Sequence, residues 1–244
     1  MKKLFLLLTF FLVSENYAQT EVEAEKNFQK IKEILSSEND FGKLKSKLDS
    51  VKLTFKDQRN NFVDYYLNRS IDFGLDHSRI RVQFDTWQYQ IDLITKNDSI
   101  YLKSLKTEYF KKYSFENLNK NALKDYLEKR NLFYKSNKTY KDLLKEISLD
   151  EIFAMYCGDG SPYTKEGLKI KKLVENGNVE KLKKILSSFN CERQSFAVLG
   201  FNLLTEKKVD YPKEYKKLIK HLKERNSELQ ICSGCITGLI EKVY

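Results

Sequence analysis

The chain of 244 residues contains 16 Phe, 15 Tyr and one Trp, an aromatic content that excludes disorder as the default interpretation. Lys and Arg number 44 against 34 Asp and Glu, and the two histidines are His77 and His221. The sequence has no His-Glu-x-x-His motif, no Gly-x-Ser-x-Gly motif and no phosphate loop, which excludes the enzyme classes that depend on those motifs.

Residues 1–18 have the order of parts that a secretory signal peptide needs. A positively charged start precedes an apolar run over residues 4–13, and Ala18 suits the position before a cleavage site. The apolar run is too short to cross a bilayer, which takes about 20 residues. The sequence therefore predicts export to the periplasm or the extracellular space, with no transmembrane span after signal removal.

Residues 19–110 begin with a helical pattern and continue with strand patterns. Over 20–36 the apolar residues recur on one helical face, and 42–49 predict a second, short helix. Apolar and polar residues alternate over 51–55 and again over 71–75, which predicts strands.

Residues 79–105 give the clearest strand signal. Alternation through Phe84 slips by one residue near Asp85-Thr86 and then continues from Trp87, which predicts a bulge or a strand boundary. The cluster over 96–99 predicts a turn, followed by a return strand. We therefore expect a small antiparallel sheet in this half of the chain.

After Phe110 the apolar residues recur at helical spacing. This pattern predicts helices over 123–127 and 140–147, and a capping box at Ser148 and Glu151 predicts a short helix over 152–156. Further starts are predicted from capping residues at Ser161-Pro162, Asn178, Asn190, Pro212 and Ser227, the last helix extending to Ile240. Residues 163–206 resemble HEAT-type helix pairs in a generic way.

The predicted fold class is α+β. An N-terminal helix and a small antiparallel sheet occupy 19–110, and a basic, all-helical antiparallel bundle occupies 111–244. Lys and Arg equal Asp and Glu over 19–110, at 15 each, whereas 111–244 carry 27 positive and 18 negative side chains. A basic half can face an acidic protein, an anionic lipid surface or a polysaccharide, while export argues against nucleic acid. The alternative interpretation is that Lys covers the solvated faces of the helices.

Four cysteines are the most specific feature of the sequence. If the predicted helices alternate in direction, the sulfurs of Cys157, Cys191, Cys232 and Cys235 lie near one end of the bundle. Two disulfides, or one disulfide with free thiols, suit an exported protein, and the helix count favours Cys157 with Cys191. A Cys₄ metal site, a redox pair of Cys232 and Cys235, and buried inert thiols are the alternatives.

Other candidate motifs are weaker. Asp76-His77-Ser78 has the residue types of a catalytic triad, but adjacent residues cannot adopt the geometry of one. Asp159 between two glycines lacks the further carboxylates of a calcium loop, and Trp87 with Tyr89 is more typical of a strand face than of a sugar platform.

These observations favour an exported, non-catalytic binding or structural module that needs no cofactor. A thiol oxidoreductase using Cys232 and Cys235, or a hydrolase of unrecognised type, is the alternative. We expect neither His77 nor His221 to carry catalysis, because no recognisable catalytic motif surrounds either residue.

The signal peptide gives the first testable prediction. The secreted chain should begin at or near Gln19, because the cut is expected directly after Ala18. Intact-mass measurement of the secreted protein checks this start. A mature species that keeps residues 4–13 would contradict the assignment.

Overall fold

The computed structural model describes residues 22–54, 61–84, 87–107 and 112–244. The predicted signal peptide, 1–18, lies outside these residues. The described chain combines helices with a five-stranded antiparallel sheet, so the α+β class is confirmed.

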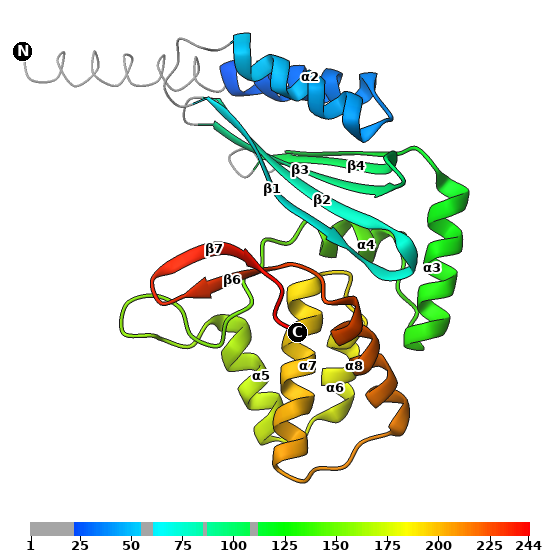
Figure 1. Cartoon of the computed structure of the whole chain (residues 1–244), viewed down its shortest axis with the longest axis vertical. Helices are drawn as coiled ribbons and strands as arrows, with labels where there is room; N and C mark the ends of the chain where they lie inside the picture. Colours follow the sequence, from blue (N-terminus) through cyan, green and yellow to red (C-terminus); the bar gives the residue numbers. More distant parts are fainter. Residues whose placement is uncertain (1–21, 55–60, 85–86, 108–111) are drawn as a thin grey trace, which may run out of the picture.

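Two N-terminal helices cover one side of the sheet (Figure 1). The first spans 22–37 and buries the face that the sequence predicted: Ala24, Phe28, Ile31 and Leu35. The second, α2 (Phe41–Thr54), continues through Val51, so the strand predicted over 51–55 is wrong. Three alternating residues are too few to distinguish a strand from the end of a helix.

The sheet is a simple meander in the order β1-β2-β3-β4-β5. Its strands are β1 (Phe62–Ser70), β2 (Asp76–Phe84), β3 (Trp87–Lys96), β4 (Ser99–Thr107) and β5 (Lys112–Asn117). The slip in alternation near Asp85-Thr86 marks the boundary between β2 and β3. Of the two predicted alternatives, a bulge or a strand boundary, the second is confirmed. The predicted turn joins β3 to β4, with Asn97 and Asp98 at φ of 48° and 64°, the left-handed conformation that tight hairpin turns require.

The two faces of the sheet differ in chemistry. The face toward the N-terminal helices is apolar, and its core includes Ile80, Val82, Tyr89 and Ile91. The opposite face carries buried polar groups beside a smaller apolar cluster: His77, Arg79, Asp92 and Ser104. Burying these groups requires partners from the elements packed on that side.

A cluster around Asp92 joins this polar face to the chain that follows α4 (Tyr140–Ile147). Asp92 Oδ1 accepts hydrogen bonds from Arg79 Nε at 2.6 Å and His77 Nε2 at 2.9 Å. Arg79 Nη2 also donates to the carbonyls of Ile147 at 2.6 Å and Leu149 at 2.9 Å. One arginine therefore binds the sheet to the end of the following helix.

Six helices occupy most of the chain after β5: α3 (Lys120–Tyr134), α4 (Tyr140–Ile147), α5 (Lys165–Glu175), α6 (Val179–Leu186), α7 (Cys191–Glu206) and α8 (Lys213–Arg225). The predicted N-caps Asn178 and Asn190 are confirmed, since each side chain accepts a hydrogen bond from the backbone three residues later. Helices α5 to α8 share an apolar core to which Tyr134 of α3 contributes.

Four predictions for this half are wrong. No helix forms over 152–156, which is extended, and α5 begins after Thr164 rather than at Ser161. The predicted last helix is a hairpin of β6 (Leu229–Ser233) and β7 (Ile236–Glu241). With β5 also inside 111–244, that range is not all-helical. The residues of the hairpin satisfy both helical and strand spacing, which is why periodicity misassigned them.

The turn between β1 and β2 is fastened to the helical half. It forms a short 3₁₀ segment, Asp72–Gly74, rather than the strand predicted over 71–75. Phe73 has a φ of 61°, which is unfavourable for an aromatic residue, and its ring lies within 6.4 Å of that of His221 of α8, centroid to centroid. The adjacent Asp72 carboxylate accepts hydrogen bonds from Arg130 Nε at 2.9 Å and Tyr134 OH at 3.1 Å, both from α3.

Among the described residues, no helix is both long enough and apolar enough to cross a membrane.

The His77 environment predicts a pH dependence of stability. Its Nε2 faces the Asp92 carboxylate, and its Nδ1 faces the Arg69 Nε donor at 3.4 Å, which leaves no place for a second ring proton. Burial lowers the pKa of His77 from 6.5 to about 4. Between pH 6.5 and pH 4, His77 is therefore protonated in the unfolded chain but neutral in the folded chain. The free energy of unfolding consequently falls as pH drops from about 6.5 to about 4.

We expect this histidine to account for a loss of about 3 kcal/mol across that window. Denaturant unfolding measured at intervals between pH 4 and pH 7 checks it. In His77→Asn the slope should decrease by about one proton, whereas an unchanged slope would assign the pH dependence to other groups.

Candidate functional site

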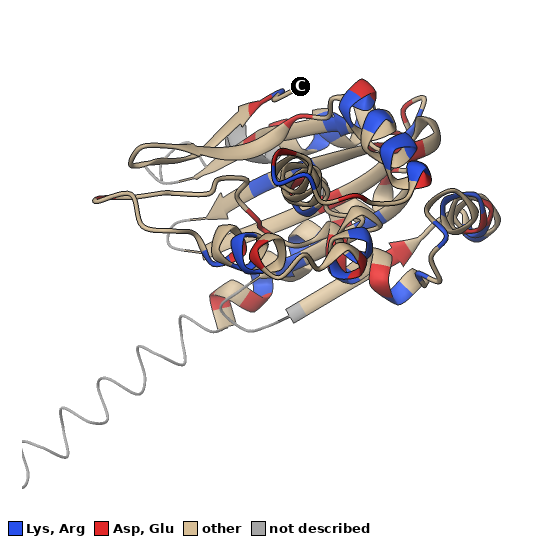
Figure 2. Cartoon of the chain, turned by 90° about the horizontal axis from the view of Figure 1, so that it is seen from below, with Lys and Arg blue, Asp and Glu red and all other residues tan. Residues whose placement is uncertain are grey.

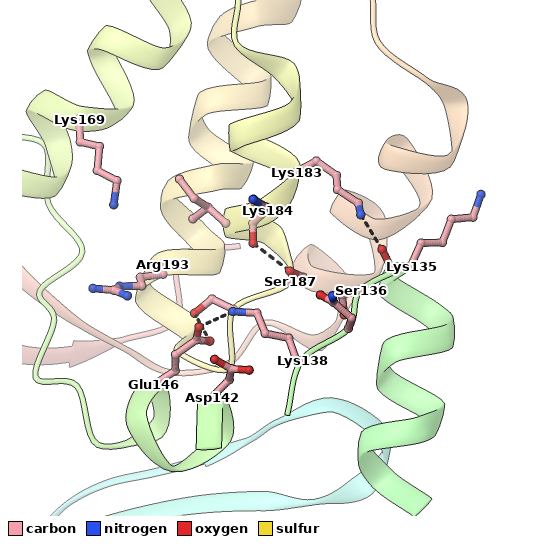
Figure 3. Close-up of a pocket in the computed structure, with 13 residues that line it drawn as sticks. Lys135, Ser136, Lys138, Asp142, Glu146, Lys169, Lys183, Lys184, Ser187 and Arg193 are labelled. Atoms are coloured by element: carbon pink, nitrogen blue, oxygen red, sulfur yellow. Dashed lines mark hydrogen bonds and ion pairs between the residues drawn. The ribbon is translucent and has the colours of Figure 1, made fainter. Parts of the chain in front are cut away.

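A basic groove of about 540 Å³ lies between the α3–α4 connection and the starts or ends of several helices. Its lining includes six cationic side chains: Lys135, Lys138, Lys169, Lys183, Lys184 and Arg193. Only two carboxylates, Asp142 and Glu146, line it. Figure 3 shows Lys138 reaching Glu146, with Lys169 and Arg193 on one side and Lys135 and Lys183 on the other.

Glu146 holds the floor of the groove. The buried carboxylate pairs with Lys138 Nζ and accepts hydrogen bonds from Ser188 Oγ at 2.9 Å and the Phe189 amide at 2.7 Å. It thereby joins α4, the α3–α4 connection and the α6–α7 connection. All of its contacts hold the protein's own groups, so Glu146 shapes the groove and is not free to act on a ligand.

The loop that carries Lys138 is fixed in place by Asn131 of α3. The Asn131 amide donates to the Lys138 carbonyl at 2.8 Å, and its oxygen accepts from Ser136 Oγ and the Lys138 amide, both at 2.8 Å. These bonds fix the backbone of Lys138, and its ammonium is held separately by the ion pair with Glu146.

The α6–α7 connection, which lines the groove with Ser187 and Ser188, is held by Arg130, a buried residue of α3. Its Nη1 donates to the Ser187 carbonyl at 2.9 Å and its Nη2 to the Ser188 carbonyl at 2.5 Å. The same guanidinium binds Asp72 of the β1–β2 turn at 2.9 Å through Nε. The groove floor is therefore tied to the sheet through one side chain.

The charges at the opening are only partly matched. Lys135, Lys169 and Arg193 pair with Glu214, Glu166 and Glu151, none of which lines the groove. Lys183 Nζ donates to the Lys135 carbonyl at 2.7 Å, and Lys184 has no ion-pair partner among the described residues. The lining therefore keeps a positive excess that favours an anionic ligand.

The groove has the composition of a binding site rather than of an acid–base site. No histidine or cysteine lines it. Asp142 is committed to the N-terminus of α4, where hydrogen bonds from the Thr139 side chain and backbone hold the pKa of its carboxyl below the usual value. Both carboxylates are thus committed to groups of the protein: Asp142 to Thr139, and Glu146 to Lys138, Ser188 and the Phe189 amide.

The cysteines do not pair as predicted. The disulfide joins Cys157 to Cys232, with Cα atoms 5.8 Å apart, while Cys191 is a buried free thiol and Cys235 an exposed one. The predicted Cys157–Cys191 bridge is wrong because 153–157 runs alongside β6, as the bridge between Phe153 and Ile231 shows. The prediction assumed a helix there.

The metal and redox alternatives lose their geometric basis. Within the described parts of the chain, no group of three or more His, Cys, Asp or Glu residues could hold a metal ion, so the four sulfurs form no Cys₄ site. Cys232 lies in a strand, and the Cys235 thiol donates to Asp159 Oδ1 at 2.9 Å. This hydrogen bond raises the pKa of Cys235, whereas a redox-active thiol needs a lowered pKa.

The two histidines and the residues flanking His77, which were considered for catalysis, make contacts that hold the fold together. Asp76 bonds to Ser70 and Ser78 to Asn68, so the residues flanking His77 do not bond to it as a triad. His221 binds Asp72 at 3.0 Å through Nε2 and lies against aromatic rings.

The two aromatic residues considered as a sugar platform pack into the first apolar core. Trp87 is partly buried there, and Tyr89 is fully buried with its hydroxyl donating to the Ala24 carbonyl at 2.8 Å. Gly158 and Gly160 both have positive φ, at 94° and 70°, around the turn that carries Asp159.

Sequence reasoning anticipated a basic half but none of the groove residues individually. Comparison with protein-family models, with curated proteins and with solved structures finds no match to this chain.

The disulfide gives a stability prediction. It links residues 75 apart in the sequence. In the chain-entropy model, a covalent loop of that length lowers the entropy of the unfolded chain and stabilises the folded protein by about 4 kcal/mol. The double variant Cys157→Ser with Cys232→Ser should lose stability of this order in denaturant unfolding. Cys235→Ser is the matched control and should unfold like the original chain, since its thiol is exposed and unbridged.

Proposed function

We propose that the protein is an exported, non-catalytic binding module whose basic groove receives an acidic segment of a partner protein. The observation that carries the proposal is the set of six cationic side chains around one groove that contains only two carboxylates. Two observations are compatible with export: the disulfide, and the absence of a membrane-spanning helix among the described residues.

An acidic protein segment fits the lining better than the other anionic partners. No aromatic ring lines the groove, so it offers no stacking surface for a sugar ring. Binding to a lipid surface requires basic side chains spread over a broad face. Figure 2 instead shows acidic positions interspersed with the basic ones on the helices. Separate ammonium groups on α5, α6 and the α3–α4 connection suit several carboxylates along an extended chain.

Binding at the groove does not need the helices to form a regular bundle. It requires that the end of α3, α4 and the α6–α7 connection stay together, which the contacts of Glu146 and Arg130 support.

A fluorescent peptide of alternating Glu and Gly, compared with its Gln counterpart, tests the proposal by anisotropy. We expect binding of the Glu peptide only, weakening as salt is added, because the contacts are between partly exposed charges. Lys184→Gln and Lys169→Gln should each weaken binding about three- to fivefold. Neither substitution removes a buried contact, so the fold should be preserved.

The matched control is Lys217→Gln, an exposed lysine of α8 that does not line the groove. Its affinity should equal that of the original chain. Equal effects of all three substitutions would show that total charge, and not the groove, attracts the peptide. Absence of binding at low salt would refute the acidic-segment proposal outright.

A further inference from the structure

In the described part of the chain, strand β5 is an edge strand of the sheet. It pairs with β4 in continuous register from Thr107 and Lys112 to Leu102 and Asn117, and the described residues place no strand on its outer side. The Leu118 amide donates to the Tyr101 carbonyl at 3.0 Å, which fixes the alternation of the ladder. The backbone N–H and C=O groups of Tyr113 and Phe115 therefore face away from β4.

Two side chains of this edge strand are large, exposed aromatic rings. Tyr113 is 43% exposed and Phe115 51% exposed, and their ring centroids lie 5.9 Å apart. Phe115 also meets Tyr140 of α4 at 6.3 Å, so a row of rings extends from the edge onto the helix. Exposed aromatic residues on a regular edge strand favour pairing with another strand.

The other edge of the sheet differs. Strand β1 carries an irregularity between Asp64 and Leu67, where its register with β2 shifts. Bulges of this kind twist an edge away and discourage pairing. The contrast leaves β5 as the edge suited to association.

We propose that β5 pairs antiparallel with β5 of a second copy of this chain, so that one sheet runs through a symmetric dimer. With the two-fold axis at Ser114, the outward backbone groups of Tyr113 meet those of Phe115 of the second copy, and the reverse pair forms by symmetry. Each tyrosine ring then lies opposite a phenylalanine ring.

This self-complementarity favours a second copy over an unrelated peptide. The residue at the axis is a small, uncharged serine, so no like charges meet there. Strand β5, with the sequence KYSFEN, contains one Lys and one Glu, so the paired strands bring no net charge to the axis.

Sedimentation analysis of the exported chain over a range of concentrations tests the proposal, and we expect a monomer–dimer equilibrium. Phe115→Lys places a charge beside the axis in both copies and should weaken association at least about tenfold. Leu132→Lys is the matched control, because Leu132 is 83% exposed on α3, away from the edge, and should leave the equilibrium unchanged. A chain that stays monomeric at all soluble concentrations, or equal effects of both substitutions, overturns the proposal.

Amide hydrogen exchange of the original chain provides a second test that requires no substitution. Protection at Tyr113 and Phe115 should rise with protein concentration, whereas Ser114 should be protected throughout because its amide already faces β4. Protection of Tyr113 and Phe115 only when an unrelated extended peptide is added would assign the edge to peptide binding instead and overturn the dimer. Unlike the groove experiment, this test does not depend on an acidic ligand, so the two proposals can fail separately.

Discussion

The buried carboxylate of Asp72 is the interaction on which the arrangement of the two halves depends. It lies in the turn between β1 and β2 and contacts Arg130 and Tyr134 of α3, and His221 and Arg225 of α8. Burial alone would raise its pKa, but the hydrogen bond from His221 and the charges of the two arginines hold the pKa well below its usual value. A buried charge must be matched in geometry as well as in sign, so this carboxylate fixes the sheet against α3 and α8 at once.

Arg130 carries that constraint to the groove. The residue contacts Asp72 through Nε and the carbonyls of Ser187 and Ser188 through its other two nitrogens. Ser188 in turn donates to Glu146, and Glu146 pairs with Lys138. The cationic lining is thus connected to the sheet by successive hydrogen bonds with defined directions, whereas apolar packing alone would leave more freedom in where the lysines lie.

Local signals were sufficient for part of this structure. The turn at Asn97-Asp98 and the cap at Asn190 depend on residues within a few positions, and the sequence identified both. The C-terminal hairpin and the Cys157–Cys232 bridge depend on a contact between Phe153 and Ile231, which no local pattern encodes. The groove was missed for the same reason. Most of its lysines lie near helix ends, and which ends come together is decided by long-range contacts such as those of Glu146.

The position of the groove also follows from how the cores divide. Helices α5 to α8 pack around one apolar core, while α3 and α4 contribute to another that includes part of the sheet. The groove lies along the boundary of these cores, with Lys169 on α5 and Lys138 beside α4. Apolar packing is non-directional, so the buried polar contacts at this boundary are what set the relative position of the two sides. The acidic segment proposed as the ligand would contact both sides. It would then bind only when they are docked, and it would stabilise the docked arrangement by mass action.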